Sequence, residues 1–111
     1  MDILFGHIYL VNFDPSIGKE YQKVRPALVI QSNAIESELV TVIPITSKIE
    51  RRNADDIVLL RNSHNRLLHD SVLKVRQISS FDKRRFVHYI GEADATTIKA
   101  VAQYLRKHFN L

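Results

Sequence analysis

The fold of this chain is decided by two apolar stretches, Arg25-Pro26-Ala27-Leu28-Val29-Ile30-Gln31 and Leu39-Val40-Thr41-Val42-Ile43-Pro44-Ile45. Both are rich in aliphatic and β-branched residues, which favour strands. The first predicts a strand over Ala27–Gln31, with Pro26 at its first position, where a missing N–H does least harm. The second predicts a central strand of a barrel or sandwich, because it is too apolar to have one face in water.

Polar side chains flank these two predicted strands. Arg25 precedes the first strand, and the hydroxyl pair Thr46-Ser47 follows the second. Arginine offers a permanent, planar fork of donors that suits phosphate, and hydroxyls beside it can donate to the same oxygens. By spacing alone this is a weak signal for an anion site at one end of a small sheet. The alternative is a solvated arginine at a strand start and an ordinary threonine at a strand end.

Further strands and one helix are predicted around this centre. Strands are expected over 7–13, 56–60, 71–78 and 86–90, the last ending at Gly91, and loops over 14–24 and 48–55. Asp94 is expected to cap a helix whose apolar face carries Ile98, Val101, Ala102, Leu105 and Phe109. The pattern predicts one domain over 1–111, mainly β with a C-terminal helix, folded as a small, strongly bent sheet or an SH3-like barrel with the helix packed against it.

The composition of the chain limits its class. It has 111 residues and no cysteine, which fits one small domain without disulfides or thiolate metal sites. No apolar run approaches the ~20 residues that span a bilayer, and no secretory signal is evident, so we expect a cytoplasmic protein without a membrane partner. The net charge of +4 and the pI of about 9.6 favour an acidic partner, either nucleic acid or protein. The same charge also suits a soluble protein with neither.

The order of short motifs along the chain resembles the MazF/PemK family of toxin endoribonucleases. These motifs are Gly6-x-Ile8, Val11-Asn12-Phe13-Asp14-Pro15, Gly18-x-Glu20, Arg25-Pro26-x-x-Val29, Pro44-x-Thr46-Ser47, Ser71-Val72, Gln77-Ile78 and Asp82-Lys83-Arg84-Arg85, followed by Gly91 and the helix. The resemblance implies a CcdB/MazF-like barrel that serves as the toxin of a type II toxin–antitoxin system. It further implies a homodimer that cleaves single-stranded messenger RNA bound along the dimer groove, and inhibition by an acidic antitoxin protein.

The resemblance also implies which side chains form the site. The catalytic or supporting positions of the family match Arg25, Thr46 and Glu20. Substrate contacts are expected from Ser47, Gln77, Lys83, Arg84 and Arg85. The chain departs from many relatives at Arg76, where an acidic residue is usual, and at Ser79, where a cation is usual. Because these departures lie on the expected RNA-binding surface, the cleaved sequence is expected to differ from that of relatives.

The implied reaction is transesterification within RNA. The ribose 2′-hydroxyl attacks the adjacent phosphorus, the 5′-oxygen leaves, and the products carry a 2′,3′-cyclic phosphate and a 5′-hydroxyl. No metal or cofactor is required, because the nucleophile belongs to the substrate. Arg25 and Thr46 suit the charge that develops on the phosphorane. Arginine keeps its proton at neutral pH, so the base stays open among Glu20, a histidine and water.

The five histidines offer an alternative source of proton transfer. A pair of imidazoles works efficiently near pH 7. His64 and His69 lie close in sequence, with Asp70 adjacent, and His88 lies in an apolar stretch. Nothing in the sequence brings two of them together, none matches a catalytic position of the family, and their spacing fits no zinc motif. We therefore expect them to be surface or structural residues.

Two other classes of function stay open. A toxin that acts on a protein, such as the gyrase inhibitor CcdB, shares the implied fold, and fold does not fix function. Such a toxin has no need to combine Arg25 with Thr46. The second alternative is a small barrel that binds nucleic acid or protein without catalysis, and salt-sensitive RNA binding without product would favour it.

Overall fold

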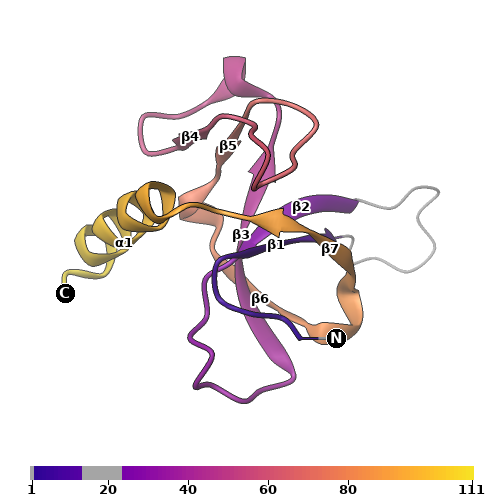
Figure 1. Cartoon of the computed structure of the whole chain (residues 1–111). Helices are drawn as coiled ribbons and strands as arrows, with labels where there is room; N and C mark the ends of the chain where they lie inside the picture. Colours follow the sequence, from indigo (N-terminus) through magenta and orange to yellow (C-terminus); the bar gives the residue numbers. More distant parts are fainter. Residues whose placement is uncertain (1, 14–23) are drawn as a thin grey trace.

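Seven strands and one α-helix make up the described part of the chain (Figure 1), which in this computed structural model comprises residues 2–13 and 24–111. The strands are β1 (His7–Asn12), β2 (Val24–Val29), β3 (Leu39–Thr46), β4 (Ile57–Leu59), β5 (Ser71–Leu73), β6 (Ser79–Asp82) and β7 (Phe86–Glu92). The helix α1 is Ala95–Phe109, and short 3-10 helices are η1 (Ile49–Arg51), η2 (Val75–Gln77) and η3 (Lys83–Arg85). The predicted class, mainly β with a C-terminal helix, is confirmed.

The sheet is organised around β3. Its strands lie in the order β4-β5-β3-β2-β1-β7, with β6 paired to β3 as a branch. β2 pairs with one edge of β3. On the other edge, β3 pairs first with β6, through 39–42, and then with β5, through Ile45 and Thr46. The long β3 therefore runs through both halves of the molecule (Figure 1), and the prediction of a central strand is confirmed.

Two apolar clusters explain why β2 and β3 are apolar along most of their length. Alternate side chains of a strand point to opposite faces of the sheet. One cluster contains Leu28, Ile43, Ile45 and, from the helix, Val101. The other contains Ala27, Val29, Val40 and Val42. Both faces of the central strands are therefore buried, as the lack of a polar face in the sequence indicates.

The strand predicted over 71–78 is wrong beyond Leu73. β5 ends there, η2 follows, and the chain then enters β6, which the sequence pattern did not predict. The break occurs at Lys74, whose backbone N–H donates to the carbonyl oxygen of Pro44 at 2.9 Å and whose ammonium pairs with Asp56. The turn at this point places Val75 in the core, fully buried.

Other boundaries shift by a few residues. β2 begins at Val24 and ends at Val29, so it starts before the predicted strand and ends before Gln31. The segment 48–55, predicted as a loop, contains η1. The predicted loop over 14–24 lies outside the described residues up to position 23.

Helix α1 begins at the predicted cap. The Asp94 carboxylate accepts a hydrogen bond from the backbone N–H of Thr97 at 2.8 Å. Hydrogen bonds from the backbone and then the side chain of Thr97 hold the pKa of Asp94 below its ordinary value, because they stabilise the charged form.

In the described part of the chain, no helix is long and apolar enough to cross a membrane.

The buried face of α1 differs in part from the predicted one. Val101 is buried, and Ile98 and Leu105 pack against the core. Ala102 and Phe109 are exposed, contrary to prediction, and Tyr104 packs against the core instead. The covered stripe of α1 therefore runs through Ile98, Val101, Tyr104 and Leu105.

Replacing Asp56 by alanine is expected to destabilise the fold. Its carboxylate lies 2.6 Å from Lys74 Nζ, and the two side chains are only 2% and 16% exposed. Removing it leaves a desolvated charge without its partner, which costs about 3 kcal/mol in the free energy of unfolding. Urea denaturation measures this change. The control is Asp55→Ala, because Asp55 pairs with Arg76 at the surface at 4.0 Å and should cost less than about 1 kcal/mol. Equal effects of the two variants would contradict the prediction.

Candidate functional site

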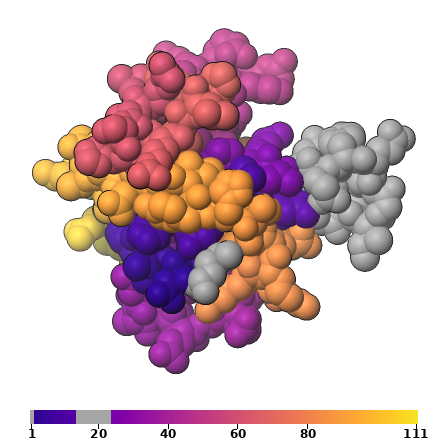
Figure 2. All heavy atoms as spheres, turned by 45° about the vertical axis from the view of Figure 1, so that its right-hand side comes forward, coloured from indigo at the N-terminus to yellow at the C-terminus, as the bar shows by residue number. Residues whose placement is uncertain are grey.

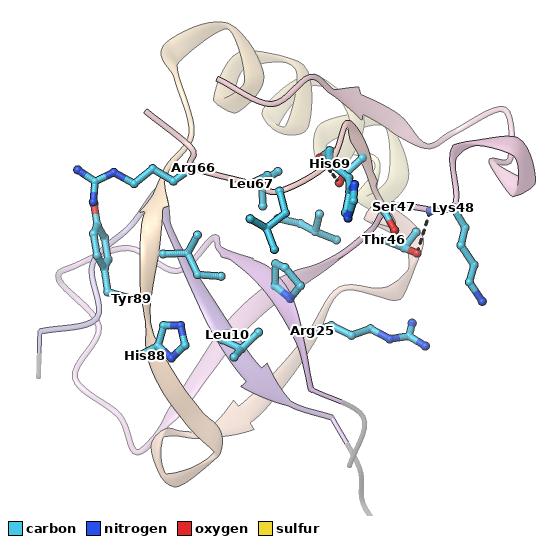
Figure 3. Close-up of a pocket in the computed structure, with 15 residues that line it drawn as sticks. Leu10, Arg25, Thr46, Ser47, Lys48, Arg66, Leu67, His69, His88 and Tyr89 are labelled. Carbon is cyan, nitrogen blue, oxygen red and sulfur yellow. Dashed lines mark hydrogen bonds between the residues drawn. The ribbon is translucent and has the colours of Figure 1, made fainter. Parts of the chain in front are cut away.

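A pocket of about 650 Å³ opens where β2 begins and β3 ends (Figure 3). Its lining comprises 15 residues from β1, β2, β3 and the turn after it, β5, β7 and the segment 60–70, which we call the wall loop. Three of them, Arg25, Lys48 and Arg66, carry permanent positive charge. None of these described lining residues is a carboxylate. The remaining lining is largely apolar, so the pocket suits an anionic ligand with flat or apolar groups.

Strand pairing brings Arg25 and Thr46 to this pocket. Ala27 of β2 lies opposite Pro44 of β3 in an antiparallel ladder. The start of β2 therefore lies beside the end of β3, and both Arg25 and Thr46 line the pocket. Ser47, the third predicted residue of this group, lines it as well (Figure 3).

The hydroxyl of Thr46 is held with its proton available. Its Oγ1 accepts a hydrogen bond from the backbone N–H of Lys48 at 3.3 Å. A hydroxyl that accepts in this way still has its own O–H to donate. Thr46 lines the pocket, so this O–H is available to a ligand there.

Two histidines that the sequence did not connect line the same pocket. Because Thr46 pairs with Val72 in the β3–β5 ladder, the residues before β5, including His69, lie near the turn after Thr46. The Ser71 hydroxyl donates to the backbone oxygen of His69 at 2.8 Å and fixes the chain there. His88 belongs to β7, across the sheet from β2. Both are exposed, as predicted, but they surround one pocket because of strand pairings that no local pattern encodes.

An irregular β7 explains how consecutive residues face the pocket. His88, Tyr89 and Ile90 all line it, although side chains of a regular strand alternate between faces. The β1–β7 ladder shifts register twice, since Ile8 and Tyr9 lie opposite Gly91 and Tyr89, and Leu10 and Val11 lie opposite His88 and Phe86. Each shift adds one residue to β7, which is the geometry of a bulge, and bulges redirect side chains.

The other predicted site residues are Glu20, Gln77, Lys83, Arg84 and Arg85. Glu20 is outside the described residues. Gln77 is exposed in η2, and Lys83, Arg84 and Arg85 form η3, so none of the four lines the pocket. Arg84 is engaged by Asp82, with Nε and Nη2 donating to the two carboxylate oxygens at 3.0 and 3.1 Å. These hydrogen bonds lower the pKa of Asp82. The predicted RNA contacts of Gln77, Lys83, Arg84 and Arg85 stay predictions.

The wall loop is fixed by one buried amide. Asn65 is 1% exposed. Its Oδ1 accepts from the backbone N–H groups of Asn62 at 3.0 Å and Leu67 at 3.1 Å, and its Nδ2 donates to the carbonyl of Leu60 at 2.9 Å. The loop packs on β7, where the Glu92 N–H donates to the His64 carbonyl at 3.0 Å. Figure 2 shows the wall loop lying over β7 on this face of the molecule.

These features define a class of protein, the bent β-barrels of the CcdB/MazF type. MazF from Deinococcus radiodurans has this fold, with a TM-score of 0.79 at 26% identity over 98% of this chain and 97% of that one. Residues 5–109 match the model of the family described as PemK-like, MazF-like toxins of type II toxin–antitoxin systems. The chain belongs to this family.

Two curated relatives are similar over nearly their whole length. Endoribonuclease MazF6 of Mycobacterium tuberculosis is 34% identical over 114 aligned positions that cover 100% of both chains. Endoribonuclease MazF9 of the same organism is 31% identical over 96% of this chain and 95% of its own. The similarity therefore extends over the whole domain, including β2, β3 and the wall loop.

Replacing Gly91 by alanine is expected to displace the wall loop. A Cβ at this position would lie 2.5 Å from the backbone oxygens of both His64 and Asn65, which cannot move without breaking the loop's hydrogen bonds. Such overpacking lowers the free energy of unfolding by about 1–3 kcal/mol. Urea denaturation checks this, with Val87→Ala as the control, since Val87 is an exposed residue of the same strand. Wild-type stability of Gly91→Ala would show that the loop does not rest on this contact.

Proposed function

We propose that this protein is the toxin of a type II toxin–antitoxin system and acts as a sequence-specific endoribonuclease on single-stranded messenger RNA. The observation that carries the proposal is that Arg25 and Thr46 line the same pocket. Lys48 and Arg66 add further positive charge to this pocket, and none of its described lining residues is a carboxylate. Family membership and similarity to proteins named endoribonucleases support it. A toxin that acts on a protein gives no reason for this pairing of arginine with a hydroxyl.

The proposed chemistry is attack of the ribose 2′-oxygen on the adjacent phosphorus. The bond from phosphorus to the 5′-oxygen breaks, giving a 2′,3′-cyclic phosphate and a 5′-hydroxyl. Arg25 binds the non-bridging oxygens and stabilises the added negative charge of the phosphorane, while Thr46 and Ser47 donate hydroxyl protons to the same group. No metal enters this scheme, because the substrate supplies the nucleophile and Arg25 supplies the charge.

The two pocket histidines are proposed to move the protons. One imidazole takes the proton of the attacking 2′-hydroxyl, and the other, protonated, gives one to the leaving 5′-oxygen. Imidazole suits both tasks near neutral pH, whereas the guanidinium of Arg25 does not give up its proton. His69 and His88 line the pocket on different elements, one in the wall loop and one in β7. Glu20 and water are the alternatives for the base.

The proposed partners follow from the same pocket. An acidic antitoxin segment matches the cations and apolar side chains around it. We propose a homodimer with RNA bound along the shared groove, which accords with the exposed apolar side chain of Leu68 in the pocket lining, at 82% exposure. Messenger RNA as substrate places the site of action in the cytoplasm.

The first test is cleavage of a long single-stranded RNA in EDTA. Wild-type protein should give discrete products ending in 2′,3′-cyclic phosphates, and Arg25→Ala should be slower by roughly a hundredfold or more, the effect of losing one preorganised donor. Arg51→Ala is the control, since Arg51 is exposed in η1 and does not line the pocket. Intact RNA with folded wild-type protein would favour a binding module or a toxin that acts on a protein.

The second test separates the roles of the histidines. His69→Asn and His88→Asn should each lower kcat by roughly 10²- to 10⁴-fold. If the replaced histidine is the base, the rate no longer rises with pH on the acidic side of the pH profile. If it is the acid, the rate no longer falls on the alkaline side. His64→Asn is the control, because it changes an exposed histidine of the wall loop that does not line the pocket. Wild-type rates and pH profiles in both variants would leave Glu20 or water as the base.

A further inference from the structure

Arg66 occupies a backbone conformation that an arginine rarely adopts. Its φ is +55°, in the left-handed region. The turn requires this conformation, because the Arg66 N–H closes the loop by donating to the Asn62 carbonyl at 3.0 Å. Glycine meets this requirement at least cost. An arginine at a strained backbone position that lines a pocket indicates that its side chain has a use there.

The structure around Arg66 leaves its backbone little freedom. The residue before it is the buried Asn65, and the residue after it, Leu67, is 7% exposed and belongs to the core. Asn65 binds the backbone on both sides of Arg66, through Asn62 and Leu67. The strain is therefore held in place by buried contacts, and the direction of the Arg66 side chain is set by the loop.

The guanidinium of Arg66 is available to a ligand. It lines the pocket, and among the described residues it makes no ion pair or side-chain hydrogen bond. This contrasts with Arg84, which is engaged by Asp82. In Figure 3 the side chain extends toward Tyr89, on the opposite side of the pocket from Arg25 and Thr46. The pocket thus has a second cationic end.

Tyr89 provides a fixed aromatic surface at this second end. It is 44% exposed and lines the pocket. Its ring packs edge to face against His7 and Tyr9, with centroid distances of 5.0 and 5.8 Å. Tyr9 in turn donates its hydroxyl to the Asp2 carbonyl at 2.9 Å. A ring that is held at its edge and exposed on another side is suited to stack on a nucleobase.

We infer that Arg66 and Tyr89 form a nucleotide subsite for the RNA strand, apart from the reacting phosphate. Tyr89 stacks on a base of the bound strand, and Arg66 binds a phosphate next to that nucleotide. The inference rests on the proposed function, since it assumes that RNA occupies the pocket. It assigns the two ends different tasks, with charge stabilisation of the reacting phosphate at Arg25 and Thr46 and strand binding at Arg66 and Tyr89.

The test measures binding, so that it does not depend on catalysis. The probe is a fluorescently labelled single-stranded RNA that spans a mapped cut, with its riboses 2′-O-methylated so that it cannot be cleaved. Arg66→Gly and Arg66→Ala should both weaken binding and reduce the slope of log K against log salt concentration by about 0.7, the value for one phosphate contact on a single strand. Tyr89→Ala should weaken binding by roughly 5- to 150-fold without changing the slope.

Matched variants separate binding from stability. Arg66→Gly suits the left-handed backbone, so its melting temperature should not fall, and a loss of RNA binding in this variant is not a folding defect. Arg61→Ala is the charge control, because Arg61 lies in the same loop, is exposed and does not line the pocket. It should keep the wild-type affinity and slope.

The outcomes of this test distinguish failure of the proposed subsite from failure of the proposed nuclease function. Wild-type affinity and slope in Arg66→Gly, with wild-type protein still cleaving RNA, would refute the subsite alone. If the wild-type protein cleaves no RNA, the probe is instead a labelled single-stranded RNA with the sequence of any RNA that the protein binds. The same losses in the Arg66 and Tyr89 variants would then support strand binding by a module without nuclease activity. Failure to bind any single-stranded RNA would remove both proposals.

Discussion

The exchange of partners along one edge of β3 is the constraint on which the rest of the structure depends. β6 pairs with β3 as far as Val42, and β5 begins to pair at Ile45. Pro44, which has no N–H to donate, lies between the two partners, so no ladder bond is lost to it on that edge. Its carbonyl still accepts from Lys74. With β6 and β5 both paired along this edge, β3 extends to Thr46, and the ladder with β2 on its other edge places Thr46 beside the start of β2, where Arg25 lies.

The fold class was predictable because its signals are local. β2 and β3 lack a polar face since both of their faces are buried, and Asp94 caps α1 as its position indicates. The prediction of a strand over 71–78 is wrong beyond Leu73, because it extends the alternating strand pattern through Lys74. The chain turns there to bury an ion pair with Asp56, 18 residues earlier. A window of a few residues contains only one member of that pair.

The site was predictable only in part. Arg25 and Thr46 were selected by family resemblance, since their types and spacing fit a solvated arginine and a plain β-forming residue equally well. His88 of β7 pairs with Leu10 of β1, which in turn pairs with Pro26 of β2, so two ladders bring His88 to the pocket. The direction of its side chain depends on the shifted register of the β1–β7 ladder. In the sequence, nothing distinguishes Arg66 from the other cations, because the residue types of a loop do not reveal which residue has a positive φ. Glu20 lies outside the described residues.

The buried Asn65 amide has a consequence for how such a protein can change over evolutionary time. Its three hydrogen bonds go to backbone atoms, so exposed side chains that make no contact with this anchor, such as Arg61 and Leu68, can be substituted without loss of these bonds. Arg25 and Thr46, by contrast, sit on strands held by the shared β3. On the proposed function, such substitutions change how the RNA strand is held, while the donors for the reacting phosphate stay in place on β2 and β3.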